Sequence, residues 1–329
     1  MTRPAPIALF AFNRPGHLGR TLDALAENEL AGDSELTVFC DGARSAAEQE
    51  SVMAVRAVAR SVRGFRQVSV VERDRNMGLA ASVIDGVTSM LAKHQAVIVM
   101  EDDLVTSRYF LRFMNDALQI YAVDERVISI CGYSYPVAGE LPETFFLGGA
   151  HCWGWATWRR GWALFEAEAQ PLLTRLEEND ELLYEFDRAG SYPHMQYLLW
   201  TTFGKGDSWA LRWMASAIVH DKLTLYPGKS LVANIGMDSS GTHESELDVY
   251  DTELADRRPR VGDIEVVQNQ RARRLLRGFH VRWRRDWGPK FRLYYLVAAL
   301  LPESIEKKLY GRIVRRALQR IRAENHCMD

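Results

Sequence analysis

The chain has 329 residues, of which 47% are hydrophobic, and a formal net charge of −2, which suits a globular protein of one large or two modest domains. Its four cysteines form no Cys-x-x-Cys pair, so neither a zinc site nor a disulfide framework is indicated. No apolar stretch reaches the roughly 18 residues of a membrane-spanning helix, and the first residues lack a signal-peptide pattern. We therefore expect a cytoplasmic protein.

The first part of the chain alternates strand-like and helix-like segments. Apolar runs predict strands, and amphipathic runs such as the one carrying Leu18, Leu22 and Leu25 predict helices. The expected strands are 7–12, 35–40, 68–72 and 96–100, and the expected helices are 16–27, 46–61 and 80–93. This order predicts a Rossmann-like α/β fold with a mixed, mostly parallel sheet and helices on both faces.

Ligands of such sheets bind at the carboxyl ends of the strands. The polar residues expected there are Asn13, Arg14, Asp41, Arg75, Asn76 and the triplet Glu101-Asp102-Asp103. The planar guanidinium of Arg14 can pair with phosphate or stack on a base. Asp41 can accept from a base or ribose, although an Asp-Gly after a strand is more often only a turn. Arg75 and Asn76 open a helix, whose first amides either hold an anion or simply begin the helix.

The acidic triplet is the strongest functional signal. Glu101, Asp102 and Asp103 directly follow the apolar run 96–100, and three adjacent carboxylates repel one another unless a cation compensates them. Magnesium or manganese fits, with a diphosphate and water completing the shell. The alternative is a solvated acidic loop.

Tryptophans gather beside glycines between residues 148 and 158. Indoles stack on sugar faces, so Trp155 is a candidate contact for a donor sugar. The alternative is that these tryptophans pack the sheet against a helix. His151, in the same segment, is more often a structural histidine than a catalyst.

Three motifs taken together resemble the inverting GT-A glycosyltransferases. They are Phe12-Asn13-Arg14-Pro15, Phe39-Cys40-Asp41-Gly42 and the segment 97–104 with its Glu-Asp-Asp variant of Asp-x-Asp. The chain is most similar to the N-acetylglucosaminyltransferase I type and to family 2-like bacterial glycosyltransferases, over roughly residues 6 to 245.

The resemblance implies roles for individual residues. Asp103 would bind Mn²⁺ or Mg²⁺, Glu101 and Asp102 the donor sugar, ribose or metal-bound water, Asp41 the base, and Arg14 the nucleotide. Asp207 matches the family's general base, and His243 falls where a loop closes over the diphosphate. The chain departs from the family in having Asp207-Ser208 where two acids are usual, and in lacking a transmembrane anchor. Asp207 can also be an exposed turn acid beside Gly206.

The charge is unevenly distributed. Residues 271–329 contain 16 Lys/Arg against 5 Asp/Glu, while the preceding part is acidic. We predict a GT-A domain over residues 1–250 and a basic, mainly helical appendage over residues 251–329. The basic segment either meets an anionic membrane surface from the cytoplasmic side or is a solvated helical subdomain. Nucleic acid is disfavoured because no nucleic-acid module is visible.

The expected function is metal-dependent, inverting transfer of a sugar from a nucleotide-sugar, with UDP favoured, to a glycan or lipid-linked glycan in polysaccharide assembly. Two alternatives remain. One is a sugar-nucleotide nucleotidyltransferase, which would ordinarily carry a glycine-rich basic signature after the first strand. The other is an inactive scaffold at the membrane surface.

Overall fold

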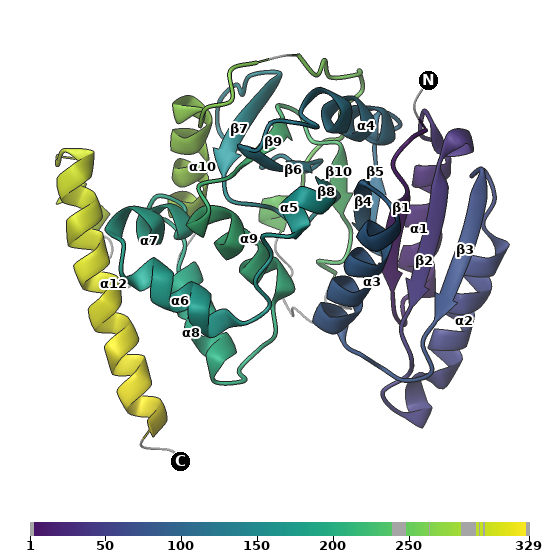
Figure 1. The fold of residues 1–329 in the computed structure, drawn as a ribbon, viewed down its shortest axis with the longest axis horizontal. Helices are drawn as coiled ribbons and strands as arrows, with labels where there is room; N and C mark the ends of the chain where they lie inside the picture. Colours follow the sequence, from purple (N-terminus) through teal and green to yellow (C-terminus); the bar gives the residue numbers. More distant parts are fainter. Residues whose placement is uncertain are drawn as a thin grey trace.

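The computed structural model describes residues 3–238, 248–262, 264–283, 294–295, 297–298 and 300–326. Its centre is an eight-stranded sheet in the order β3-β2-β1-β4-β8-β6-β9-β7, and a two-stranded sheet pairs β10 with β5 (Figure 1). The strands are β1 (Ile7–Ala11), β2 (Glu35–Cys40), β3 (Gln67–Glu72), β4 (Ala96–Glu101), β5 (Leu104–Thr106), β6 (Val127–Cys131), β7 (Thr144–Gly148), β8 (Trp155–Trp158), β9 (Leu223–Pro227) and β10 (Val232–Asn234).

Most of the large sheet is parallel. The strands β1 to β4 all run one way, and β6 and β9 share that direction because β8 lies antiparallel between β4 and β6. Only β8 and the edge strand β7 run against it in the described chain. The predicted mixed, mostly parallel sheet is confirmed.

Helices cover both faces of this sheet. The α-helices are α1 (Pro15–Ala26), α2 (Gln49–Ser61), α3 (Leu79–Lys93), α4 (Phe110–Ile120), α5 (Arg159–Trp162), α6 (Ala169–Glu177), α7 (Asp180–Phe186), α8 (His194–Thr202), α9 (Trp209–Val219), α10 (Gln270–Trp283) and α12 (Glu303–His326), and the 3-10 helices are η1 (Ala31–Asp33), η2 (Ala46–Glu48) and η3 (Asp248–Tyr250). The four strands and three helices expected in the first part of the chain all form, and most of their bounds agree within a residue or two. The exception is the helix expected over 46–61, whose first turn is the 3-10 helix η2 and whose remainder is α2.

Alternation along β1 explains why the sheet is buried on both sides. Ile7 and Leu9 point to the face covered by α1 and α2, whereas Ala8 and Phe10 point to the face covered by α3. All four side chains are buried. Successive strand residues point to opposite faces, so an uninterrupted apolar run is what a sheet covered on both sides requires.

A helical layer lies beyond the β7 end of the sheet. The helices α6 to α9 and α12 share one apolar cluster, and Figure 1 shows α12 at the opposite end of the molecule from β3. Within the described residues, none of the helices has both the length and the apolar character needed to cross a bilayer.

The segment after residue 250 is helical in α10 and α12, and it packs into the cores of the preceding part. Ala255 and Val266 join the main apolar cluster, while Leu276 and Phe279 of α10 pack beside β7 with Phe145. The domain boundary predicted near residue 250 is therefore not marked by a break in packing.

Candidate functional site

The predicted site residues come together at one edge of the sheet because β1, β2, β3 and β4 are parallel. Asn13 and Arg14 follow β1, Asp41 follows β2, Arg75 and Asn76 follow β3, and the acidic triplet begins at the last residue of β4. The carboxyl edge is where ligands of open α/β sheets bind.

Three of the predicted residues at this edge form an ion-pair triad. One terminal nitrogen of Arg14 lies 2.5 Å from Asp102 Oδ1 and 2.7 Å from Asp103 Oδ2. Arg14 precedes α1 directly, and Pro15 at the first helical position fixes where that helix begins. The guanidinium therefore supplies part of the positive charge that the sequence assigned to a metal ion.

Glu101 and Asp102 are held in an environment that disfavours their charge. Burial, together with Asp103 and Asp102, raises the pKa of Glu101 to about 8. Burial also raises the pKa of Asp102 to about 6, although Arg14 partly offsets that rise. Burial opposes the charged form of Arg14, but the two aspartates outweigh it and raise the pKa of the guanidinium. A cationic ligand would stabilise the ionised form of these acids.

The segment after β10 lies against Asp103 and Arg14. The sequence analysis did not predict this contact. Ile235 donates its amide to the Asp103 carbonyl at 2.8 Å. A Cβ on Gly236 would lie 2.2 Å from Asp103 Oδ2 and 2.9 Å from Arg14 Nη1, so a larger residue there would have to displace these side chains. His17 of α1 approaches Asp238 at 3.1 Å. Nothing in the local spacing of residues 234–238 indicates these contacts, which arise from the pairing of β10 with β5.

Asp41 holds the neighbouring loop in place. Its carboxylate accepts backbone amides from Gly42 and Met77 at 2.9 Å and from Gly78 at 3.0 Å, and its side chain is buried. Asn76 donates to the Gly42 carbonyl at 2.8 Å. A Cβ on Gly42 would lie 2.4 Å from the backbone of Arg75, so the close approach here is between two loops of the protein. Asp41 thus has a structural role, whatever it does for a ligand.

Trp155 does not lie where a donor sugar could stack on it. Its side chain is 0% exposed in β8 and is surrounded by the rings of Trp162, Trp209 and Trp213 at centroid distances of 5.5 to 5.9 Å. Trp155 is therefore a core residue and not the donor-sugar contact that we expected. Burying the apolar indole between β8 and α9 is more favourable in free energy than exposing it to water.

Asp207 lies in the loop before α9, the helix whose Trp209 and Trp213 pack against Trp155. The stacking of Trp209 on Trp155 sets the amino end of α9 beside the carboxyl end of β4, since Trp155 pairs with Val99. The Asp207 side chain is 65% exposed and its Oδ1 lies 2.7 Å from Arg212. Ser208, which replaces the second acid of the family pattern, caps α9 by accepting the Leu211 amide.

The remaining predicted residues contribute less. Asn13 makes a long contact of 3.5 Å to Glu48, and Arg75 is exposed. His243 lies outside the described residues, so its expected role stays a prediction. His151 is a structural histidine, as favoured above: it accepts the Trp153 amide at Nδ1 and contacts the Tyr135 hydroxyl at 3.0 Å through Nε2.

The residues present suit a metal that the protein holds through one or two carboxylates. Among the described residues, no group of three or more His, Cys, Asp and Glu side chains converges on one point. Magnesium commonly binds through one or two protein carboxylates plus substrate phosphates and water, which Asp103 and Asp102 can provide. Any such ion would share these oxygens with Arg14.

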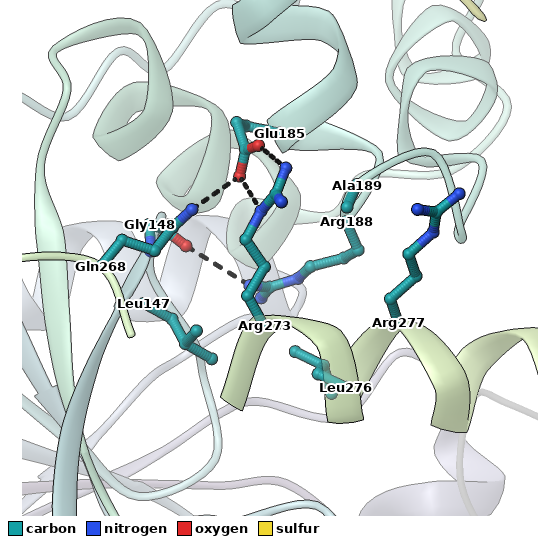
Figure 2. A pocket seen from close by; sticks show the side chains of 9 residues that line it. All are labelled: Leu147, Gly148, Glu185, Arg188, Ala189, Gln268, Arg273, Leu276 and Arg277. Atoms are coloured by element: carbon teal, nitrogen blue, oxygen red, sulfur yellow. Dashed lines mark hydrogen bonds and ion pairs between the residues drawn. The ribbon is translucent and has the colours of Figure 1, made fainter. Parts of the chain in front are cut away.

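Among the described residues, cavities also lie outside this cluster. One, of about 210 Å³, opens between the segments that follow β6 and β9, and is lined by Tyr135, Val137, Leu141, Lys229 and Glu253 among others. Another, of about 20 Å³, lies beside α10 (Figure 2), where Arg273 pairs with Glu185 and Arg188 points to the Gly148 carbonyl at 3.4 Å. The smaller cavity has room for about one water molecule, so we interpret it as part of the contact between α7 and α10.

No protein-family model matches the chain, and no curated protein does. Among solved structures, the mannosyltransferase PcManGT from Pyrobaculum calidifontis, in complex with GDP-Man and Mn²⁺, is 16% identical over 41% of this chain and 37% of its own, with a TM-score of 0.29. S. aureus TarS 1-349 is 12% identical over 49% of this chain and 48% of its own, with a TM-score of 0.32. A further S. aureus TarS structure is 15% identical over 42% of this chain and 23% of its own, with a TM-score of 0.27. The chain spans less than half of each of these structures, and likenesses of this extent carry no argument about activity.

Proposed function

We propose that this protein is a glycosyltransferase that moves a sugar from a nucleotide-sugar to a hydroxyl acceptor. The observation that carries the proposal is the partly buried triad of Arg14, Asp102 and Asp103 at the carboxyl end of β4. It puts one fixed cation and two carboxylates at the edge where diphosphate groups bind in sheets of this kind. The resemblance of the surrounding motifs to the inverting GT-A enzymes supports the same activity.

Binding of the diphosphate would rest on Arg14 and the carboxylates. The guanidinium can donate to phosphate oxygens in a forked geometry, and Asp103 with Asp102 would hold a Mn²⁺ or Mg²⁺ ion. When bound, that ion would neutralise charge on the departing nucleoside diphosphate. Asp41, through its hold on residues 77 and 78, positions the loop next to the nucleotide.

The chemistry we propose is a single displacement. The acceptor oxygen forms a bond to the anomeric carbon as the bond from that carbon to the diphosphate oxygen breaks, which inverts the configuration. Asp207 takes the hydroxyl proton as general base. Its exposure and its place in a loop with Gly204 and Gly206 suit contact with an acceptor, and Arg212 lies 2.7 Å from the carboxylate.

The acceptor is proposed to be a glycan or lipid-linked glycan. The cavity of about 210 Å³ lies between the carboxyl ends of β6 and β9, on the same side as the triad, and offers the ring of Tyr135 and polar groups such as Ser134 and Lys229. Sugars combine apolar faces with hydroxyl rims, so a lining of this mixed kind fits them.

The first test is a thermal-shift panel of uridine, guanosine, adenosine and thymidine diphosphates with and without Mn²⁺. The resemblance favours UDP, so we expect metal-dependent stabilisation by UDP, because a ligand that binds only the folded form raises its stability. Asp103→Asn should abolish the shift. Asp33→Asn, at an exposed acid just before the amino end of β2 and so at the opposite edge of the sheet from the triad, is the matched control and should leave it intact. Absence of any nucleotide response would refute the proposal.

The second test concerns the base. Asp207→Asn should retain the nucleotide-induced stabilisation and lose sugar transfer, and product analysis by NMR should find the inverted anomer. A retained anomer would instead indicate a retaining enzyme, which needs no such base. Release of pyrophosphate from a nucleoside triphosphate and a sugar phosphate would favour the nucleotidyltransferase alternative.

A further inference from the structure

The outer face of α12 carries a row of four basic side chains. Lys308, Arg312, Arg316 and Arg320 recur every four residues, and all are exposed. The buried residues Glu306, Tyr310, Val314 and Leu318 recur with the same spacing, two positions earlier in each turn. Two residues correspond to about 200° around a helix, so the basic row lies opposite the packed row.

The rotation of α12 is fixed by ion pairs along its inner flanks. Lys307 binds Glu181 at 2.6 Å, Arg315 pairs with Asp180, and Arg322 pairs with Glu177, all partners in or beside the neighbouring helices α6 and α7. Arg273 of α10 reaches Glu303 at 3.0 Å while it also holds Glu185 (Figure 2). Glu177, Asp180 and Glu181 thus form ion pairs with the inner flanks of α12 and not with its outer row.

The outer row has no acidic partner among the residues that the structure describes. Like charges four residues apart on a helix destabilise it slightly, and among the described residues no ion pair offsets that cost, with Glu324 as the one acid a turn beyond Arg320. It spans about 18 Å, since 12 residues separate its ends and a helix rises about 1.5 Å per residue. An anionic partner with charges spread over such a length would compensate it.

Exposed apolar side chains lie in the first turn of α12 and before it in the chain. Leu300 is 85% exposed, Ile305 51%, Trp283 43% and Val297 40%. Ile305 lies one turn before Lys308, on the exposed face of the helix. Basic residues combined with exposed aliphatic and aromatic groups are typical of helices that lie in a membrane interface, where the apolar groups enter the headgroup region. Nucleic acid would compensate the charges but not the apolar groups.

We propose that the outer face of α12 docks on an anionic lipid bilayer, with Lys308, Arg312, Arg316 and Arg320 against the headgroups and Ile305 and Leu300 at the acyl boundary. Figure 1 shows α12 at the outer edge of the molecule, with α6 to α8 on its inner side, so a flat surface can approach it. This docking surface does not depend on the glycosyltransferase proposal.

The test is co-sedimentation of the full chain with vesicles of phosphatidylcholine alone or with phosphatidylglycerol added. Each basic residue near an anionic surface contributes about fivefold to partitioning. The quadruple variant K308Q/R312Q/R316Q/R320Q should therefore lose at least about a hundredfold on anionic vesicles, whereas neutral vesicles should bind both proteins weakly. Glutamine keeps high helix propensity, so α12 should still form.

The matched control is R20Q/K93Q/R108Q/R257Q, which removes the same charge from exposed positions elsewhere. It should bind anionic vesicles within a few-fold of the unsubstituted chain. If the quadruple variant is poorly folded by circular dichroism, R316Q/R320Q should still lose roughly 25-fold. Equal loss in variant and control, no loss in either, or binding of the unsubstituted chain to an oligonucleotide duplex but not to vesicles would overturn the proposal. Nucleotide-induced thermal shifts should be the same in all these proteins, so this result is read separately from that of the donor panel.

Discussion

Replacing His151 should flatten the pH dependence of stability below neutral pH. Burial, with Arg188 and His280 nearby, lowers the pKa of His151 from 6.5 to about 3. Because the pKa is lower in the folded state, the unfolded chain binds the proton first as pH falls through 6.5. The stability contributed by the neutral imidazole is therefore full above pH 6.5 and is lost progressively as pH falls toward 3.

The size of this effect follows from the two pKa values. With one extra proton bound by the unfolded state, the free energy of unfolding falls by up to about 1.4 kcal/mol per pH unit, or about 2 kcal/mol between pH 8 and pH 5. Urea unfolding at pH 8, 7, 6 and 5 would measure it in the unsubstituted protein and in His151→Gln. We expect the difference in unfolding free energy between the two proteins to change by about 2 kcal/mol over that range.

The comparison uses the change with pH and not the stability at any single pH. Loss of the contacts to Trp153 and Tyr135 lowers the stability of His151→Gln at every pH, and that constant offset cancels. Parallel curves for the two proteins between pH 8 and pH 5 would refute the reasoning, since they would mean that the imidazole titrates normally in the folded state.

Three further substitutions test a contact beside the triad, a core residue and a helix cap. Gly236→Ala should destabilise the fold by about 1–3 kcal/mol in chemical denaturation, because its methyl group must displace Asp103 or Arg14, and an unchanged midpoint would contradict the close contact. Trp155→Ala should cost about 3–5 kcal/mol, read from the same curves, while a cost below about 1 kcal/mol would mean that the indole is not a core residue. Asn179→Ala should cost about 1 kcal/mol through loss of the cap on α7, whose Glu181 and Leu182 amides it accepts, and a lack of change in the thermal midpoint would rule out that cap.

Much of the first half of the fold was predictable from local patterns. Buried parallel strands need unbroken apolar runs, and the run 96–100 has that form, so both β4 and the position of the acidic triplet at its end follow from the sequence. The later strands were not assigned. The strand β8 runs antiparallel and β10 is only three residues long, and neither has a periodicity that local pattern analysis can separate from a loop.

The site itself was only partly predictable. The sequence brings Arg14, Asp41 and the triplet to one edge through the order of strands and helices. It does not reveal that Arg14 binds two of the three acids, since these residues are almost 90 positions apart. It also suggested the wrong environment for Trp155, because a tryptophan beside glycine has the same local pattern in a sugar site and in a core.

By itself, then, the sequence determined the elements, their alternation and the charge each loop carries, since these depend on residue type and on neighbours within a few positions. Only the tertiary structure decided that Gly236 lies against Asp103, that Asp41 accepts the amide of Met77, and that four basic residues of α12 are exposed on its outer face. Such contacts join distant parts of the chain, and they are selected by how whole surfaces pack together, a property that no single segment contains.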